Sequence, residues 1–401
     1  MDLTDGEEHR AFRVQVRVFI EQNRHLAPKT AAQSYRLRPR PYERDTLRWQ
    51  KLLVEHGYAC RTVPAEYGGF GAEEDILKTA IISEEFFAAD LPQGLNSQGI
   101  SMLVPTILEH GTEAQKSAWI EKTILGEVFW CQGYSEPDAG SDLTSLKTAA
   151  VEDGDDFVIN GQKIWTSSAH IAQMMFCLVR TEADAPRHAG ISYMIFPVDL
   201  PGIEIRPLQT MTGHPSFNEV FLTDVRVPKT ALVGDRGQGW VVANSTLKHE
   251  RGMLGAAHGL AWRLSRLRDL IARQKAAGSL AMPIEVLRDR YAGLQARVEG
   301  LRLHEMRLVS MAAENQPAGT GALVCKLLGC ELNHQLDILA MDLRGPESAA
   351  YNPDAELASD EIWHQLSMYD LGLIIGGGTA QIQKNIIAKR GLGMPREARR
   401  N

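Results

Sequence analysis

The hydrophobic periodicity of the sequence changes twice along the chain, and this change constrains the possible folds more than any other feature. The N-terminal third and the part after Gly239 carry apolar residues at three- and four-residue spacing, which is typical of amphipathic helices. The segment between them consists of short β-prone runs separated by turn residues. The sequence therefore predicts a multidomain α–β–α fold, with an N-terminal α-helical domain (1–127), a central small antiparallel β domain (128–236) and a C-terminal four-helix bundle (237–401).

Two local signals place individual elements within this plan. Thr112 is followed by Glu113 and an apolar repeat, so we expect Thr112 to cap the N-terminus of a helix. Asn160 and Gly161 stand between two β-prone runs, and an Asn-Gly pair in that setting predicts the turn of a β-hairpin. A crevice where such a β domain meets helices is a favoured place for a flat ligand.

Composition argues against several classes of protein. The formal net charge of −7 argues against nucleic acid as a partner. The sequence has no run of about 18 apolar residues, so it predicts no membrane span, and its acidic N-terminus lacks the pattern of a secretory signal. The cysteines are scattered and lack the spacing of a zinc site, so we expect no metal and a reduced, cytoplasmic location; they are Cys60, Cys131, Cys177, Cys325 and Cys330.

One stretch, WCQGYSEPDAGSDLTSLKT (130–148), carries most of the chemical information. It gathers several hydroxyl side chains around two glycines and a Pro-Asp turn. Hydroxyls and exposed backbone N–H groups at this density suit a ring with several heteroatoms or a pyrophosphate. From the residue types alone, a polar surface loop is an equal alternative.

This stretch and five others together resemble the acyl-CoA dehydrogenase family, in the order and spacing of its motifs and over nearly the whole chain. The other five are VPAEYGGFG, HGTEAQKSAWI, NGQKIWTSS, FNEVFLTDVRVP and GGGTAQIQKNIIAKRGLGMPRE. The resemblance implies the α–β–α fold, bound FAD and α,β-dehydrogenation of an acyl-CoA thioester to the trans-2-enoyl-CoA. It also implies a place in lipid catabolism by β-oxidation, with an electron-transferring flavoprotein as the electron acceptor.

The resemblance assigns the cofactor contacts. In the family, the segment matching residues 132–141 wraps the flavin ring, and the hydroxyl matching Ser135 bonds to its pyrimidine side. The segment matching 165–167 packs on the far face, where the Ser167 hydroxyl would donate toward N5, the atom that receives the hydride. From the residues alone, Trp165 would instead be interpreted as a core aromatic. The implied contacts are Gln132, Gly133, Tyr134, Ser135, Ser141, Trp165, Thr166, Ser167, Thr379 and Gln381.

The base that takes the α-proton is not where many family members carry it. They have a glutamate in a Tyr-Glu-Gly-Thr motif, and the aligned position here is Gly377, which has no proton acceptor. Other members carry the base on the first helix of the C-terminal bundle, and Glu250-Arg251 matches their glutamate-arginine pair. A carboxylate buried against flavin and substrate has the raised pKa that the role requires. The alternative is a solvated glutamate that pairs with Lys248 or Arg251.

Gly377 keeps a role of its own in this comparison. Its backbone N–H would bind the thioester carbonyl and stabilise the enolate as the proton leaves. Loss of the side chain would enlarge the pocket beside the α-carbon, which suits a branched or bulky acyl group. The resemblance implies further substrate contacts at Ser141, Lys248, Arg251 and Gly378.

Two departures from the family concern the adenosine half of the FAD site. Arg273 lacks the Phe-Gly that follows it in many homotetrameric members, and only Gly345 remains of a Gln-x-x-Gly-Gly stretch. Such changes also occur in members that act on bulky acyl groups and form two-chain heterotetramers. We expect a homotetramer or dimer of dimers. These two departures keep a heterotetramer open as the alternative. Two other functions stay open, namely a flavin-dependent acyl-CoA oxidase or monooxygenase and a non-catalytic partner subunit.

Overall fold

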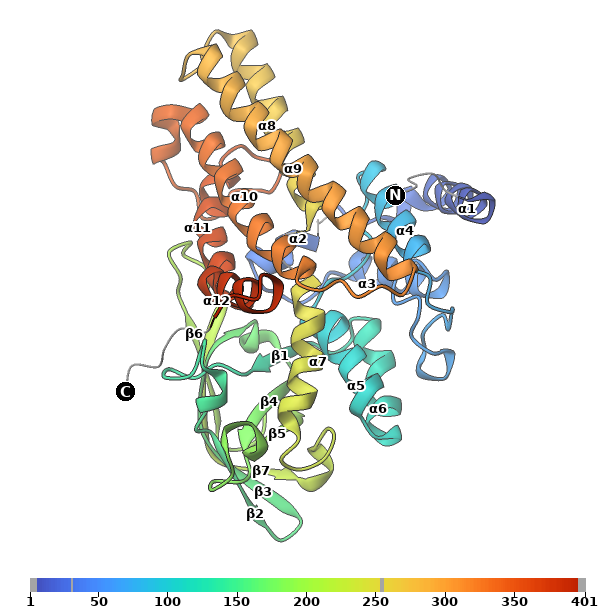
Figure 1. Ribbon diagram of the computed structural model, residues 1–401, viewed down its shortest axis with the longest axis vertical. Coiled ribbons are helices and arrows are strands. Elements are labelled where there is room, and N and C mark those ends of the chain that lie inside the picture. Colours follow the sequence, from blue (N-terminus) through green and yellow to red (C-terminus); the bar gives the residue numbers. More distant parts are fainter. Residues whose placement is uncertain (1–5, 30–31, 253–255, 396–401) are drawn as a thin grey trace. The chain divides into compact units, whose positions relative to one another are not determined.

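The computed structural model describes the chain except for residues 1–5, 30–31, 253–255 and 396–401. The chain separates into two compact units, residues 7–250 and the part from residue 251 onward, and each is considered by itself (Figure 1). The first unit contains helices, a β-sheet and one further helix, and the second is helical. The predicted α–β–α order is therefore confirmed. Among the described helices, none combines the length and the apolar character needed to cross a membrane.

In the described part of the first unit, six α-helices precede the sheet. The apolar faces of the first, third and fourth of them meet in a core around Trp49, whose indole nitrogen donates to the Pro92 carbonyl at 2.7 Å. Thr112 caps α6 as predicted, because its hydroxyl accepts from the Gln115 N–H and the Gln115 side chain accepts from the Thr112 N–H in return. The helices are α1 (Glu7–Asn23), α2 (Ala32–Leu37), α3 (Arg44–Glu55), α4 (Ile76–Ala88), α5 (Val104–His110) and α6 (Glu113–Ile124).

The strands form one largely antiparallel sheet in the order β1-β4-β2-β3-β7-β6, and β5 pairs with β4 outside that path. β1 and the start of β2 pair in parallel with β4, whereas the other pairs are antiparallel. β4 and β5 are buried along almost their whole length and supply much of the core of the sheet. The strands are β1 (Trp130–Gly133), β2 (Ala149–Asp153), β3 (Asp156–Ser167), β4 (Met174–Arg180), β5 (Ile191–Pro197), β6 (Ile203–Leu208) and β7 (Phe217–Pro228).

The predicted hairpin turn at Asn160-Gly161 is wrong. β3 runs through both residues, and the turn between β2 and β3 lies between Asp153 and Asp156, which pair with each other. Asn160 instead lies opposite two residues of β7, Thr223 and Asp224, where the pairing of β3 with β7 shifts, so the extra residue belongs to β7. Its side chain donates to the Asp224 carboxylate at 3.0 Å and accepts from the Asp224 N–H at 2.9 Å, so it fixes the bulge of β7 to β3.

Helix α7 (Gly239–Gly252) follows the sheet and packs against a helix that precedes it. Thr246 of α7 and Thr106 of α5 are both fully buried, and their hydroxyl oxygens lie 3.0 Å apart. This contact fixes the rotation of α7 about its axis. It therefore also fixes the backbone of the last turn of α7, which contains Glu250.

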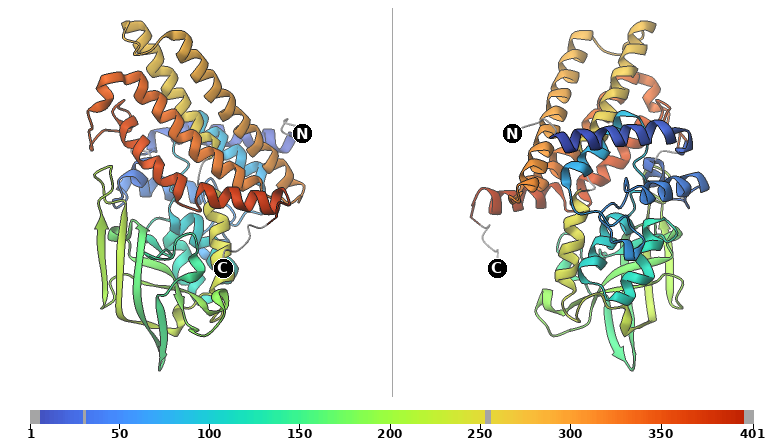
Figure 2. Two further views of the ribbon diagram at one scale, coloured as in Figure 1. Left: turned by 60° about the vertical axis from the view of Figure 1, so that its left-hand side comes forward. Right: turned by 90° about the vertical axis from the view of Figure 1, so that its right-hand side faces the viewer.

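Among the residues of the second unit that the structure describes, four long helices are followed by a short fifth (Figure 2). A buried cluster joins three of them, with Arg263 of α8 between Asp337 of α10 and Asp370 of α11. Arg263 Nη1 lies 2.7 Å from Asp370 Oδ2 and also contacts both oxygens of Asp337. The helices are α8 (Ala257–Ala277), α9 (Ile284–Ala313), α10 (Gly321–Arg344), α11 (Ile362–Ile375) and α12 (Ala380–Ile386).

Gly161→Ala should destabilise the sheet, because an added Cβ would lie 2.4 Å from the Thr148 hydroxyl oxygen and 2.7 Å from the Thr148 Cα. The backbone would have to move, so we expect the free energy of unfolding to fall by about 1–3 kcal/mol. Gly293→Ala is the matched control, since an added Cβ there meets nothing within 4 Å and alanine stabilises a helix interior. Denaturant unfolding measures both variants, and equal stability would contradict the close approach at Gly161.

Candidate active site

A buried ion pair holds the loop after β1 against the sheet. Lys163 of β3 is fully buried, and its ammonium nitrogen lies 2.8 Å from the Glu136 carboxylate and 3.3 Å from the Tyr134 carbonyl oxygen. Glu136 also accepts from the backbone N–H groups of Lys147 (2.6 Å) and Thr148 (2.9 Å) and from the Thr148 hydroxyl (2.6 Å). The pair therefore fastens both ends of the 134–148 loop to a single strand.

Glu136 is held in its charged form. Burial raises the pKa of its carboxyl, but the Lys163 ammonium and the hydrogen bonds from Thr148 and Lys147 outweigh burial and hold the pKa below its usual range. Charge-assisted hydrogen bonds of this kind are stronger than neutral ones. The loop that carries the predicted flavin contacts is thus anchored from its buried side.

The predicted flavin contacts on and beside this loop divide into two groups. Gly133 and Tyr134 are buried, and a Cβ at position 133 would lie 2.7 Å from a side-chain sulfur of β4. Gly133 is therefore required for the packing of β1 on β4. Gln132 and Ser135 are partly exposed and Ser141 is exposed, so these three side chains are accessible to a ligand.

Trp165 interrupts the regular pairing of β3 with β7. The register shifts between Lys163 and Thr166, and Trp165 has a left-handed backbone (φ 58°) that a bulky residue rarely adopts. Its side chain is 59% exposed and packs edge-to-face on the Phe217 ring at 6.0 Å. Thr166 is fully buried, and its hydroxyl has no hydrogen-bond partner within the described chain, whereas Ser167 is partly exposed. A bulge that turns a large aromatic ring outward presents an apolar surface to a planar ligand.

The three glycines separate α11 from α12. Gly377 and Gly378 both have left-handed backbones (φ 62° and 87°), which glycine adopts without strain. Thr379 then caps α12, and its hydroxyl accepts from the Ile382 N–H at 3.1 Å. The Thr379 hydroxyl is thus already engaged within the chain, whereas Gln381 is exposed.

The predicted base, Glu250, lies next to residues that the structure does not describe. Glu250 and Arg251 lie in the last turn of α7, and their side chains are outside the described part of the chain. The backbone places Glu250 one helical turn after the buried Thr246, and Lys248 between them is exposed. Glu250 belongs to the first unit and Gly377 to the second.

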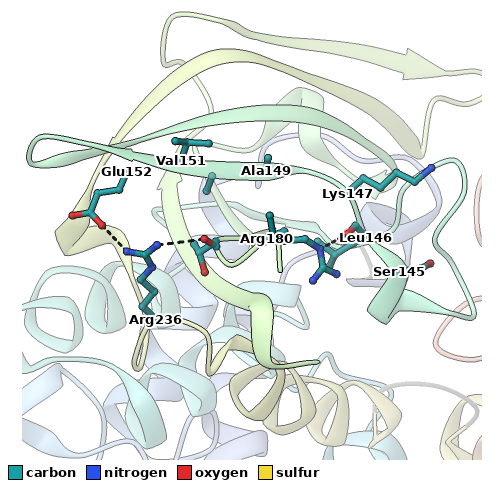
Figure 3. A pocket seen from close by; sticks show the side chains of 11 residues that line it. Ser145, Leu146, Lys147, Ala149, Val151, Glu152, Arg180 and Arg236 are labelled. Atoms are coloured by element: carbon teal, nitrogen blue, oxygen red, sulfur yellow. Dashed lines mark hydrogen bonds and ion pairs between the residues drawn. The ribbon is translucent and has the colours of Figure 1, made fainter. Parts of the chain in front are cut away.

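A surface hollow of about 560 Å³ in the β domain contains none of the predicted flavin contacts (Figure 3). Two arginines at its wall are already engaged. Arg236 Nη1 lies 2.5 Å from Glu152 Oε2, and Arg180 donates to the carbonyls of Thr144 (2.9 Å) and Leu146 (3.0 Å). Arg180 therefore joins the end of the 134–148 loop to β4. The hollow is lined by Ser145, Leu146, Lys147, Ala149, Ala150, Val151, Glu152, Arg180, Thr181, Ala183 and Arg236.

The sequence alone does not single out the residues that hold this site. Lys163 and Glu136 lie within recognised motifs, yet neither matches a ligand contact. The alternation of β3 did indicate one of them, because Lys163 falls among the inward-facing positions of that strand. A buried lysine requires an acceptor for its charge, so a buried partner for Lys163 could have been expected. Lys326 and Gln383, which hold the glycine turn, gave no comparable signal.

Comparison with known proteins agrees with the motifs. Three family models match successive parts of the chain, namely the N-terminal (6–127), middle (131–225) and C-terminal (237–392) domains of acyl-CoA dehydrogenase. The chain is 41% identical to acyl-CoA dehydrogenase IpdE1 of Mycobacterium tuberculosis, over 99% of this chain and 100% of that protein. Its fold is similar to the Tcur3481-Tcur3483 steroid ACAD (TM-score 0.81, 30% identity, 99% of this chain and 100% of that one). It is also similar to the ChsE4-ChsE5 complex from Mycobacterium tuberculosis (TM-score 0.79, 28% identity, 99% and 100%).

Lys163→Met should lower the free energy of unfolding by about 3–5 kcal/mol, because the Glu136 carboxylate would stay buried without its cation. The double variant Lys163→Met/Glu136→Gln removes both charges and should recover much of this loss. Urea unfolding at pH 7 compares the variants. A Lys163→Met protein as stable as the wild type would contradict the anchoring role of the pair.

The same pair predicts a pH dependence. The pKa of Glu136 is lower in the folded protein than the ordinary value of 4.5, so its contribution to stability is present above that value and is lost as pH falls through the folded pKa. The wild type should therefore lose stability on acidification, and Lys163→Met should lose less over the same range. Unfolding midpoints measured from pH 7 down to about pH 3 test this, since the ordinary and lowered carboxyl pKa values fall in that interval.

Proposed function

The chain belongs to the acyl-CoA dehydrogenase family, whose members are flavoprotein oxidoreductases of lipid catabolism that act on CH–CH groups, and we propose that it converts an acyl-CoA thioester to the trans-2-enoyl-CoA. The observation that carries the proposal is the anchored 134–148 loop beside the outward-facing ring of Trp165. A rigid polar loop and an exposed aromatic side chain on one sheet suit a cofactor with a flat, heteroatom-rich ring.

FAD is the cofactor that these residues fit. The exposed Trp165 side chain offers an apolar surface to its ring, and Gln132, Ser135, Ser141 and Ser167 offer accessible hydrogen-bonding groups to its heteroatoms. When bound, FAD would supply the acceptor for the β-hydride of the substrate. Further contacts would come from the backbone of Gly133, Tyr134 and Thr166, and from Thr379 and Gln381.

Two groups of this chain would act on the substrate directly. Glu250 would take the α-proton on its carboxylate, and the Gly377 N–H would donate to the thioester carbonyl oxygen, where negative charge develops. The fixed rotation of α7 supports this role for Glu250, because a base must be held in one place to be effective. Ser141, Lys248, Arg251 and Gly378 would contact the rest of the acyl-CoA.

We further propose a bulky, branched or ring-bearing acyl group and a second, different chain in a heterotetramer. The names of the two similar structures given above each combine two different chains, and one of the two is a steroid enzyme. Gly377 is consistent with such a substrate, because glycine leaves space where many members have a glutamate. An electron-transferring flavoprotein would accept the electrons.

The proposal is tested by anaerobic bleaching of the flavin of the purified holoenzyme with straight, branched and ring-bearing acyl-CoAs. Ring-bearing and branched thioesters should bleach it fastest. No loss of flavin absorbance with any of them would contradict the dehydrogenase assignment. Faster turnover with oxygen than with an artificial acceptor would instead indicate an oxidase.

Glu250→Gln should keep its bound flavin but slow bleaching by acyl-CoA by at least about 100-fold, because the amide cannot accept the α-proton. Glu285→Gln, the same change at an exposed position of α9, should leave the rate unchanged. Single-turnover absorbance traces measure both. Unimpaired reduction in Glu250→Gln would rule out this residue as the base.

Gly377→Glu should slow turnover of bulky thioesters relative to short straight ones, because the new side chain would fill the space beside the α-carbon. The left-handed backbone of Gly377 (φ 62°) disfavours any side chain at this position and would by itself slow the enzyme. The measurement is therefore the ratio of kcat/KM for the two substrate classes, and not the absolute rate. Faster turnover of bulky substrates by the variant would contradict the space argument.

A further inference from the structure

Two buried donors hold the glycine turn from one side. The Lys326 ammonium, from α10, donates to the Gly378 carbonyl at 2.8 Å (Figure 1 shows α10 and α12). The Gln383 amide nitrogen, from α12, lies 3.2 Å from the Gly377 carbonyl oxygen and 3.4 Å from that of Gly378. Both side chains are only 1% exposed. Two consecutive carbonyls of the turn therefore point into the interior of the second unit.

Packing alone does not require a lysine at this position. A buried ammonium costs several kcal/mol unless its hydrogens find acceptors, whereas an apolar side chain of similar length would fill the space without that cost. What the ammonium adds is a charge-assisted bond, which is shorter and stronger than a neutral one. Lys326 therefore fixes the direction of the Gly378 carbonyl more firmly than a neutral donor would.

The direction of these carbonyls sets the direction of the neighbouring N–H groups. Across a planar trans peptide, the carbonyl of one residue and the N–H of the next point in opposite directions. With the carbonyls of Gly377 and Gly378 drawn inward, the N–H groups of Gly378 and Thr379 point away from Lys326. The left-handed backbone of Gly377 then fixes its own N–H relative to them, and none of the described backbone carbonyls accepts from that N–H.

We propose that Lys326 is a positioning residue for the reaction, which fixes the glycine turn so that the Gly377 N–H can meet the thioester carbonyl oxygen. The proposal rests on the proposed function, in which that N–H stabilises the developing negative charge. Lys326 acts through the Gly378 peptide and does not touch the substrate. Gln383 supports the turn at the Gly377 carbonyl.

Lys326→Met removes the donor while keeping a side chain of similar length. In the holoenzyme, kcat should fall by about tenfold or more, as expected when a carbonyl donor is misplaced, with little change in KM. The second measurement is the pKa of bound acetoacetyl-CoA, read from the absorbance of its enolate. It should rise by about one unit, because a poorly placed donor stabilises the enolate less. A purely structural defect would weaken binding without moving that pKa.

Lys384→Met is the matched control, since Lys384 of α12 is 62% exposed and its ammonium lies 3.7 Å from the Glu331 carboxylate. It should leave kcat and the enolate pKa unchanged. If Lys326→Met does not fold, Gln383→Leu replaces it and should raise the enolate pKa in the same direction. An unchanged kcat and enolate pKa in the folded variant would overturn the role of Lys326. Failure of the wild type to bleach with any acyl-CoA would instead overturn the proposed function.

Discussion

The ion pair between Lys163 and Glu136 is the contact on which the polar face of the β domain depends. Lys163 lies at the point where β3 leaves its regular pairing, just before the strained backbone of Trp165. Glu136 binds the far end of the 134–148 loop through Lys147 and Thr148. One buried pair thus supports two segments that are distant in sequence and that both carry predicted flavin contacts. Neither segment could be rigid through apolar packing alone, because each must leave polar or aromatic groups exposed.

The second unit also uses a buried lysine to hold a backbone segment in place. The glycine turn has no side chains of its own to pack, so its shape is set by Lys326 and Gln383 behind it. In both units, a fully buried lysine holds a backbone segment from the inside while the other side of that segment stays accessible. A binding surface built in this way gains its precision from residues that never touch the ligand.

The sequence predicted features that depend on local pattern and missed those that depend on distant partners. The α–β–α order and the Thr112 cap follow from periodicity and short spacing, and both are confirmed. The Asn160-Gly161 turn was wrong because the deciding partner, Asp224, lies 64 residues away. Lys326 donates to a backbone carbonyl 52 residues further on. Every residue has such a carbonyl, so the sequence does not show which one accepts the bond. The role of Glu250 stays a prediction, since it came from the family resemblance.

The buried cluster of the second unit sets one arginine against two aspartates. Burial raises the pKa of Asp337 well above its usual range, and the Asp370 carboxylate adds to this rise while Arg263 only partly opposes it. The protonated form of Asp337 is therefore favoured in the folded unit, and the stability that it contributes is lost as pH rises through the raised pKa. Glu136 in the first unit responds in the opposite sense, because its pKa is lowered. The two buried clusters thus respond to pH in opposite senses: acidification removes the contribution of Glu136 in the first unit, whereas a rise in pH removes that of Asp337 in the second.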